Sequence, residues 1–293
     1  MTRCSRKICI VIFSFLLFGC KSAGANIVKE ASGYIPVKYP IILVHGIAFH
    51  DRGVRLNAWN RIPQKLRENG VQVYYGNTDS WGSYETNADI LKTTIDSVLL
   101  ETESGKVNII AHSKGGLDAR YCIWKYDYWD KVASLITIST PHLGSEIADE
   151  IFNGKLIHSR LAMRTLEIFG SLYRDTNPDM YNVNYELTTA NMNEFNEKVL
   201  WDDRVYFVSM YTTLRNPLDD PAFFSSYRFL KKASGDNDGL VSEHSVHWGN
   251  NTVKIASGIS HNEIIDQRIR KIAGKDIPEI YLKLADLLSK MGF

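Results

Sequence analysis

A short stretch in the middle of the chain combines an apolar run, a serine among small residues and the start of a helical pattern. Asn108–Ala111 resembles a strand, Ser113 is followed by glycines, and apolar periodicity begins at Leu117. This order predicts the strand, sharp turn and helix of a nucleophile elbow, which exposes the serine hydroxyl. Ala111 and Gly115 stand two residues before and after the serine, where larger side chains would collide. Ser followed by Gly-Gly also occurs in ordinary loops, so the flanking strand and helix carry the interpretation.

Apolar runs alternate with helical patterns along most of the chain, which predicts an α/β fold whose mainly parallel sheet has helices on both faces. The expected strands are Ile41–Val44, Val71–Tyr75, Val107–Ala111, Val132–Ser139, Val205–Val208 and Val253–Ala256. The expected helices are Asn57–Asn69, Asn87–Glu101, Leu117–Tyr126 and Ile277–Met291. Ligands of such sheets bind beyond the carboxyl ends of the strands. His45-Gly46, Ser113 and Thr140-Pro141 follow strands and are therefore expected at one edge.

The length of 293 residues and the hydrophobic content of 44% suit one α/β domain, expected over residues 26–293. The alternation breaks over about residues 143–198, where apolar residues at helical spacing predict an inserted, lid-like helical segment. The central residues of this pattern are Ile157, Leu161, Leu166, Phe169 and Leu172. The insertion is either a mobile lid or a part of the core. With 34 Lys and Arg against 33 Asp and Glu, nothing in the charge favours a nucleic-acid partner.

Residues 1–25 are typical of a secretory leader, because basic residues precede the apolar run Ile8–Gly19, which is too short for a stable membrane anchor. Two cleavage sites compete. Leu17–Cys20 resembles a lipoprotein box that would place lipid on Cys20, and Ala23–Ala25 is an ordinary signal-peptidase site. The polar tether that starts at Lys21 favours the lipoprotein. We therefore expect an exported protein that is either anchored to a membrane surface through Cys20 or secreted.

The leader also takes most of the cysteines with it. Cys4, Cys9 and Cys20 fall in or at the end of the leader, so the mature domain keeps Cys122 alone. We expect no disulfide in the mature domain, and Cys122 is predicted to be a small buried hydrophobic residue.

A serine hydroxyl needs a base to remove its proton, and a carboxylate to orient that base. After a nucleophile elbow the chain order is serine, acid, histidine, which leaves three late histidines. His261 follows the last expected strand, in the loop where the base belongs, and is preferred to His244 and His247. The latter two are predicted to be surface or supporting residues.

The turn before Leu240 offers two carboxylates between the serine and His261. Asp-Gly is an ordinary turn signal, but this one lies between the serine and the histidine, where the catalytic acid is expected. We prefer Asp238 to Asp236 as that acid. The oxyanion hole is expected from the backbone N–H groups of Lys114 and Ile47. The side chain of Lys114 is expected to point to solvent or to pair with an acid.

Several motifs together give the chain a more specific resemblance. They are Val44–Ile47, Ala111–Gly116, Ser139–Ser145, Leu187–Ala190 and Asn237–Val241. In this order, across Pro40–Phe293, the chain resembles the calcium-dependent bacterial triacylglycerol lipases of the pseudomonad type. The resemblance implies the α/β-hydrolase fold and a triad of Ser113, Asp238 and His261.

The expected activity is hydrolysis of carboxylic esters, most of all acylglycerols, through an acyl-serine intermediate. Lipid or ester is then the substrate, and the chemistry needs no cofactor. A short-chain esterase or an acyltransferase is the second interpretation. A surface lipoprotein that uses the fold only for binding is the third, which an intact triad disfavours.

The resemblance also implies one structural calcium ion near the histidine loop. Asp220 stands at the position of the first carboxylate ligand and Glu263 at the second, while Gln267 and Lys271 stand at the two carbonyl positions. The chain departs from the family by carrying Glu rather than Asp at 263, although calcium accepts oxygen ligands at flexible distances. The chain also lacks the cysteines that form the disulfide common in that family.

Overall fold

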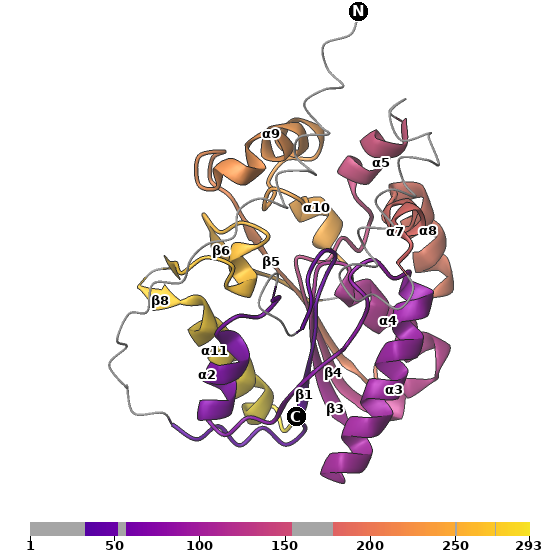
Figure 1. Cartoon of the computed structure of the whole chain (residues 1–293), viewed down its shortest axis with the longest axis vertical. Helices are drawn as coiled ribbons and strands as arrows, with labels where there is room; N and C mark the ends of the chain where they lie inside the picture. Colours follow the sequence, from indigo (N-terminus) through magenta and orange to yellow (C-terminus); the bar gives the residue numbers. More distant parts are fainter. Residues whose placement is uncertain (1–32, 52–56, 154–177, 250, 273) are drawn as a thin grey trace, which may run out of the picture.

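The computed structural model describes residues 33–51, 57–153, 178–249, 251–272 and 274–293 (Figure 1). The expected leader, including Cys20, and the apolar residues Ile157–Leu172 of the expected insertion lie outside these ranges.

A single sheet of six parallel strands forms the centre of the fold. The strands are β1 (Ile41–Val44), β2 (Val73–Tyr75), β3 (Val107–His112), β4 (Val132–Ile138), β5 (Tyr206–Thr213) and β6 (Thr252–Ser257). Their order across the sheet is β2-β1-β3-β4-β5-β6, and every pairing is parallel. The predicted α/β class and parallel sheet are confirmed.

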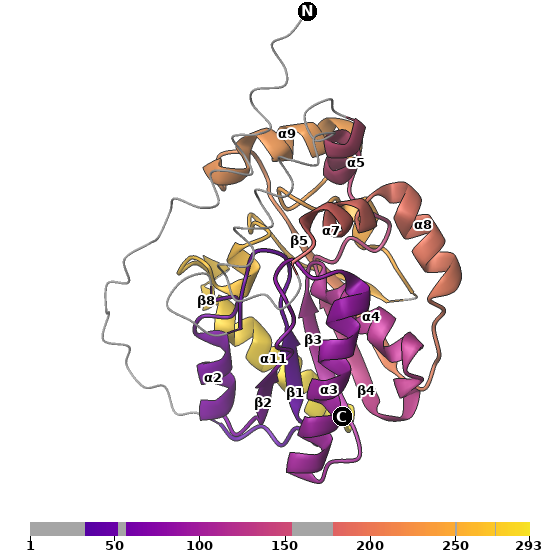
Figure 2. The ribbon, with the colours of Figure 1, turned by 45° about the vertical axis from the view of Figure 1, so that its right-hand side comes forward.

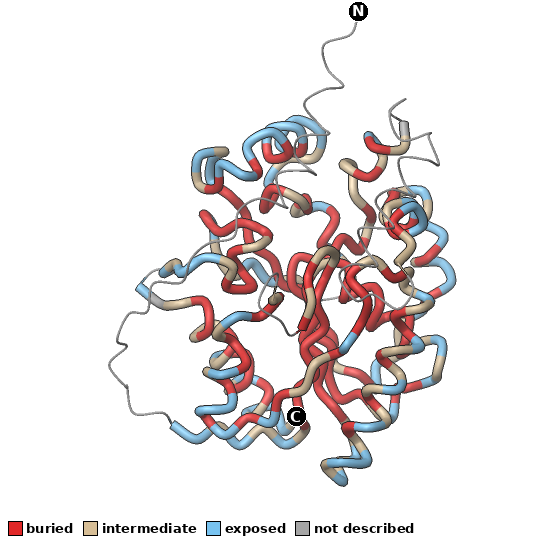
Figure 3. The backbone as a smooth tube through the Cα atoms, viewed as in Figure 1, coloured by how far each residue is buried: buried red, intermediate tan, exposed pale blue. Residues whose placement is uncertain are grey.

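Helices cover both faces of the sheet (Figures 1 and 2). Helices α3 (Tyr84–Thr102) and α4 (Gly115–Lys125) pack on one face, and α2 (Ile62–Glu68) and α11 (Ile277–Lys290) on the other. Strand β1 shows why both faces are apolar: alternate residues of the strand point into opposite clusters, and all four are fully buried. In Figure 3 the inner strands β1, β3, β4 and β5 are buried along nearly all of their length, whereas edge strand β6 is intermediate or exposed, and exposed residues lie on the outer sides of the helices.

Two predicted elements begin two or more residues later than expected. The helix expected from Asn57 begins at Ile62, because Asn60 has a φ of 37°, outside the helical range, and Pro63 occupies the first turn. The strand expected from Val71 begins at Val73, because the Val71 N–H closes the end of α2 on the Leu66 carbonyl at 3.2 Å.

Further helices lie beyond the carboxyl ends of the strands (Figures 1 and 2). Between β4 and β5 these are α5 (Glu146–Asn153), α7 (Met180–Glu186) and α8 (Thr189–Lys198). The predicted insertion therefore contains helices, as expected. A second group between β5 and β6 was not predicted and comprises η2 (Pro221–Phe223), α9 (Phe224–Ala233) and α10 (Glu243–Val246).

The remaining short elements are η1 (Tyr128–Asp130), η3 (Glu263–Ile265) and the antiparallel pair β7 (Lys271–Ile272) and β8 (Lys275–Asp276). Cys122 is a free, fully buried cysteine on α4, as expected for a small hydrophobic residue. Within the described ranges, no helix combines the length and the apolar character that a membrane crossing requires.

Candidate active site

The predicted elbow is present between β3 and α4. Ser113 has a φ of 55°, a left-handed conformation that a non-glycine residue adopts only under constraint. Helix α4 begins two residues later at Gly115. A Cβ atom on Gly115 would lie 2.3 Å from the carbonyl oxygen of His45, so glycine is required where the turn approaches β1. Ser113 is only partly buried, which leaves its hydroxyl accessible.

The loop after β1 packs directly against this serine. Val44 pairs with Ala111 in the sheet, so the two strands end side by side. A Cβ atom on Gly46 would lie 2.7 Å from Ser113 Cβ. Ile47, whose N–H is the predicted oxyanion donor, is therefore the next residue along a segment in contact with the nucleophile. The second predicted donor is the N–H of Lys114, the residue that directly follows Ser113 in the chain.

The segment after β4 joins the same edge through Thr140. The Thr140 hydroxyl donates to the carbonyl oxygen of Ser113 at 2.8 Å, and the Ser113 N–H donates to the Ile138 carbonyl at 2.9 Å. These bonds hold the strained turn against β4. The predicted gathering of His45-Gly46, Ser113 and Thr140 at one sheet edge is confirmed.

The candidate base and acid are bonded to each other. His261 Nδ1 lies 2.8 Å from Asp238 Oδ2, and the His261 N–H donates to the Asp238 carbonyl at 3.0 Å. The other carboxylate oxygen, Oδ1, accepts from the N–H groups of Leu240 and Val241 at 3.0 and 2.8 Å. Both side chains are buried. Because Oδ2 only accepts, His261 carries its proton on Nδ1 and leaves Nε2 free to act as a base.

The competing candidates face solvent. His244 and His247 are exposed on and after α10. Asp236 is exposed too, and it forms an ion pair with Lys231. Of the two carboxylates in this turn, Asp238 is the one that contacts His261.

A second histidine supports His261 and was missed in the sequence. His112, the last residue of β3, donates from Nε2 to the His261 carbonyl at 3.0 Å, and the two rings lie 4.5 Å apart. Burial, with the neighbouring His261 adding to it, lowers the pKa of His112 well below its usual value, so the ring is neutral. His112 thereby connects the residue before the nucleophile to the histidine loop. Its place directly before Ser113 was the only sequence signal available.

The side chain after the nucleophile is paired with an acid, the second of the two expectations for it. Lys114 is buried and forms an ion pair with Asp118 on α4. Asn87 donates to the other oxygen of Asp118 at 2.9 Å. Nearby, Glu186 at the end of α7 accepts from the Tyr84 N–H at 3.0 Å. Burial raises the pKa of Glu186 to about 7.

The carboxylates predicted to bind calcium lie close together beside the histidine loop. Asp220 and Glu263 are both buried, and Arg268 Nη1 lies 3.0 Å from Asp220 Oδ1 and 3.7 Å from Glu263 Oε1. Gln267 donates from its side-chain amide to backbone carbonyls ahead of α2, and Lys271 begins β7. An arginine therefore lies within ion-pair distance of both carboxylates. The calcium ion itself stays a prediction of the resemblance.

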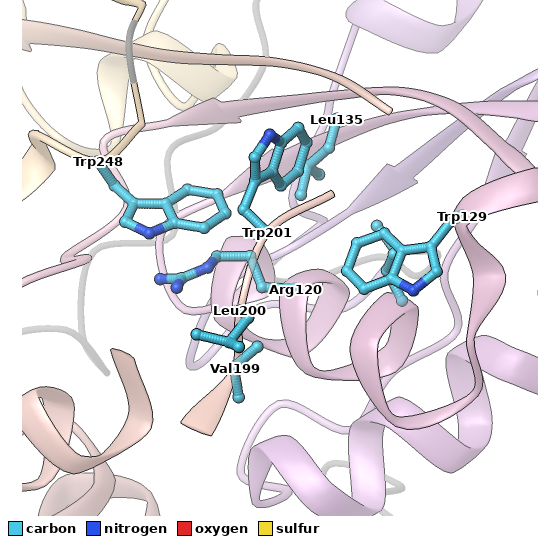
Figure 4. Close-up of a pocket in the computed structure, with 8 residues that line it drawn as sticks. Arg120, Trp129, Leu135, Val199, Leu200, Trp201 and Trp248 are labelled. Carbon is cyan, nitrogen blue, oxygen red and sulfur yellow. The ribbon is translucent and has the colours of Figure 1, made fainter. Parts of the chain in front are cut away.

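A small cavity lies away from these residues (Figure 4). Its volume of about 10 Å³ is room for a single water molecule. The Arg120 guanidinium lies 3.5 Å from the ring centre of Trp248 at its wall, and the other lining residues are apolar. Since none of the lining residues belongs to the elbow or the histidine loop, this cavity is not a substrate pocket for Ser113.

The chain matches a protein family over most of its length. The sequence profile of the palmitoyl protein thioesterase family matches residues 40–256. A triacylglycerol lipase of Vibrio cholerae is 35% identical over 48% of this chain and 44% of that protein. Triacylglycerol lipase 2 of Saccharomyces cerevisiae is 30% identical over 91% of this chain and 96% of that protein. The chain spans about half the length or less of four bacterial relatives it matches, 39 to 55%.

The fold is that of known lipases. The crystal structure of Staphylococcus hyicus lipase superposes with a TM-score of 0.70 at 16% identity, covering 90% of this chain and 98% of that one. At this identity the likeness concerns the fold alone, and it identifies the six-stranded parallel sheet and its helices as an α/β-hydrolase fold.

Proposed function

The chain belongs to the palmitoyl protein thioesterase family and has the α/β-hydrolase fold, and from this premise we propose that it is a serine ester hydrolase. Its triad is Ser113, Asp238 and His261. The observation that carries the proposal is the Asp238–His261 bond of 2.8 Å, placed beside the elbow by the contact of His261 with His112. A binding protein with this fold would have no need of a buried, oriented histidine next to a strained serine.

The reaction begins with proton transfer from the serine. Nε2 of His261 removes the Ser113 hydroxyl proton as the oxygen attacks the ester carbonyl. Asp238 accepts from Nδ1 throughout and stabilises the imidazolium that forms. Two backbone N–H groups bond the Asp238 carboxylate, and the His261 N–H bonds the Asp238 carbonyl. The acid is therefore ordered before substrate arrives.

The oxyanion forms between two backbone donors. The N–H groups of Ile47 and Lys114 stabilise the negative carbonyl oxygen of the tetrahedral intermediate. The imidazolium then protonates the leaving alcohol, which departs and leaves an acyl group on Ser113. Water, deprotonated by His261, hydrolyses this acyl-serine to release the carboxylic acid and restore the serine.

The substrate is an acyl ester of lipid type, with triacylglycerol first. The names of the Vibrio and yeast relatives support acylglycerols, and the matching family profile supports long-chain thioesters as the second candidate. A short-chain esterase and an acyltransferase are the further alternatives. Each uses the same acyl-serine, so they differ only in the acyl chain accepted and in the group that receives it.

The test is a substrate panel run on the full chain. It contains triacylglycerols, single-chain esters from acetyl to palmitoyl, and a palmitoyl thioester, each with and without an added alcohol acceptor. We expect hydrolysis of long-chain esters, covalent labelling of Ser113 by a fluorophosphonate, and loss of both in Ser113→Ala. A folded protein that hydrolyses none of these substrates and is not labelled would overturn the proposal.

We also propose that the protein is exported and held at a membrane surface by lipid on Cys20. The basic start, the apolar run and the lipoprotein-like box support this location. Cys20→Ser should release the protein from the membrane fraction or block its processing. A mature protein that begins at Asn26 by mass spectrometry would instead establish the ordinary signal peptide.

A further inference from the structure

Two buried carboxylates hold the backbone immediately before the candidate base. The Ser260 hydroxyl donates to Asp220 Oδ2 at 2.7 Å, and the Ser260 N–H donates to Glu263 Oε2 at 3.1 Å. Asp220 is 2% exposed and Glu263 is fully buried. Since Ser260 precedes His261 directly, the two carboxylates fix the start of the histidine loop. Two buried negative charges so close together need positive charge nearby.

Two arginines from the same loop supply that charge. Arg268 reaches both carboxylates from Nη1, 3.0 Å from Asp220 Oδ1 and 3.7 Å from Glu263 Oε1. Arg270 Nη1 lies 3.0 Å from Glu263 Oε1 and donates to the Asp219 carbonyl at 3.0 Å. The two positive charges balance the two negative ones. The guanidinium groups are partly exposed, with the side chain of Arg268 at 48% and that of Arg270 at 33%.

The residues present do not fit a calcium ion. All four carboxylate oxygens already accept hydrogen bonds: those of Asp220 from Ser260 and Ala222, and those of Glu263 from Ser260 and Arg270. Arg268 adds an ion pair to Asp220. A divalent ion would have to displace these donors and would meet two guanidinium groups of like charge. Both the oxygen ligands and the negative charge that a cation needs are therefore already taken.

We propose that Arg268 and Arg270 perform, for this chain, the structural role that calcium performs in the lipases it resembles. They are positioning residues: they neutralise Asp220 and Glu263, which hold Ser260 and thereby keep His261 in line with Ser113. The inference rests on the proposed function of His261. It predicts an enzyme whose histidine loop is ordered without any divalent metal.

The test compares the wild type with Arg268→Ala/Arg270→Ala, each in EDTA and in millimolar calcium. The Tm of the wild type should be the same in both within about 1 °C. The double variant should lose roughly 10- to 100-fold in kcat with little change in KM, because the base is misplaced and substrate binding is not. Calcium should raise the Tm and kcat of the double variant. Removing both arginines leaves the two carboxylates without a counter-charge, which the calcium ion can then supply. Arg268→Lys, which keeps the charge, should retain more kcat than Arg268→Ala and serves if the double variant does not fold.

Arg204→Ala is the matched control, because Arg204 is a similarly exposed arginine, at 46%, whose ion pairs lie away from the histidine loop. It should leave kcat and the response to calcium unchanged. A wild type that loses Tm in EDTA and regains it with calcium would overturn the proposal, as would a double variant with unaltered kcat. The Tm of Ser113→Ala in EDTA and in calcium tests whether the fold depends on calcium without requiring any activity. Its outcome can therefore be distinguished from a failure of the proposed function.

Discussion

The two halves of the candidate site are held in place by different physical means. The elbow around Ser113 is fixed by close backbone contacts to adjacent strands, where a Cβ atom on Gly46 or Gly115 has no room. The loop around His261 is fixed by charged and polar side chains from distant parts of the chain, such as Asp220 and Asp238. Contacts of the first kind depend on shape and are insensitive to pH and salt. Contacts of the second kind depend on charge. Changes of charge should therefore affect the loop around His261 more than the elbow around Ser113.

Removing the nucleophile should have the largest effect on activity and almost none on the fold. Ser113→Ala should lower kcat for ester hydrolysis by on the order of 10⁴-fold or more. The Tm should stay equal or rise slightly, because the substitution removes only the hydroxyl and leaves the packing contacts of the elbow intact. Turnover by single-substrate kinetics and unfolding by calorimetry measure the two quantities. Near-normal turnover by the folded variant would contradict the role of Ser113.

Removing the charge of the acid should have the next largest effect. Asp238→Asn keeps the shape of the turn but stabilises the wrong tautomer of His261, and should cost on the order of 10³- to 10⁴-fold in kcat. Asp236→Asn is the matched control two residues away, exposed and paired with Lys231. It should change kcat by less than about twofold, as for an exposed ion pair. The reverse ranking would make Asp236 the catalytic acid.

The same difference explains which parts could be predicted from the sequence. The elbow is encoded locally: a strand, a serine, a glycine and a helix within ten residues specify it, and the structure has it as expected. The parallel sheet was equally accessible because its buried strands are continuous apolar runs. The order of motifs then placed Asp238 and His261.

Local sequence patterns did not predict the supports of the histidine loop, because they join residues far apart in the chain; the resemblance placed Asp220 and Glu263 beside this loop, but as calcium ligands. Arg61 bonds Asp266 across a sequence separation of 205 residues, and Ser260 bonds Asp220 across 40. Nothing in a local pattern specifies such a pair. Helix α9 was missed for a related reason, since its short apolar face packs on loops and not on the sheet. Arg268 and Arg270 were not singled out in the sequence, and the fold places them beside buried carboxylates.

The packing of the elbow can be tested with a single methyl group. Gly115→Ala would put a Cβ atom 2.3 Å from the His45 carbonyl oxygen and 2.7 Å from that of Val44. Both are backbone atoms at the end of a buried strand and cannot move away cheaply. We expect a loss of about 3 kcal/mol, the upper end of the usual cost of overpacking, in the free energy of unfolding measured by urea denaturation.

Gly105→Ala is the control for this substitution, because a Cβ atom there meets no atom within 4 Å. It should be neutral or should stabilise by up to about 1 kcal/mol through the unfolded chain. If both glycine variants lost stability equally, tight packing would not be what distinguishes the elbow.

Glu186 tests whether the elbow side of the site is as insensitive to charge as its backbone contacts suggest. Burial raises the pKa of this carboxyl from its ordinary value to about 7, while Lys114 opposes the rise and Asp118 and Glu85 add to it. Below the ordinary pKa the carboxyl is neutral in both the folded and the unfolded protein. As the pH rises, the unfolded chain loses its proton first, so stability falls until the pH passes about 7 and then levels off.

Glu186→Gln should remove this fall, because the amide stays neutral while its oxygen still accepts from the Tyr84 N–H. The wild type should lose about 2 to 3 kcal/mol of unfolding free energy between pH 5 and pH 8, since each pH unit of pKa displacement is worth about 1.4 kcal/mol. Urea denaturation at closely spaced pH values measures the curve, and Glu197→Gln, an exposed carboxyl on α8, should leave it unchanged. A wild-type curve that is flat or rises over this range would mean that Glu186 is ionised in the folded protein. The elbow side would then contain a buried charge in addition to the Lys114–Asp118 ion pair, and the contrast with the histidine loop would be weaker than the backbone contacts suggest.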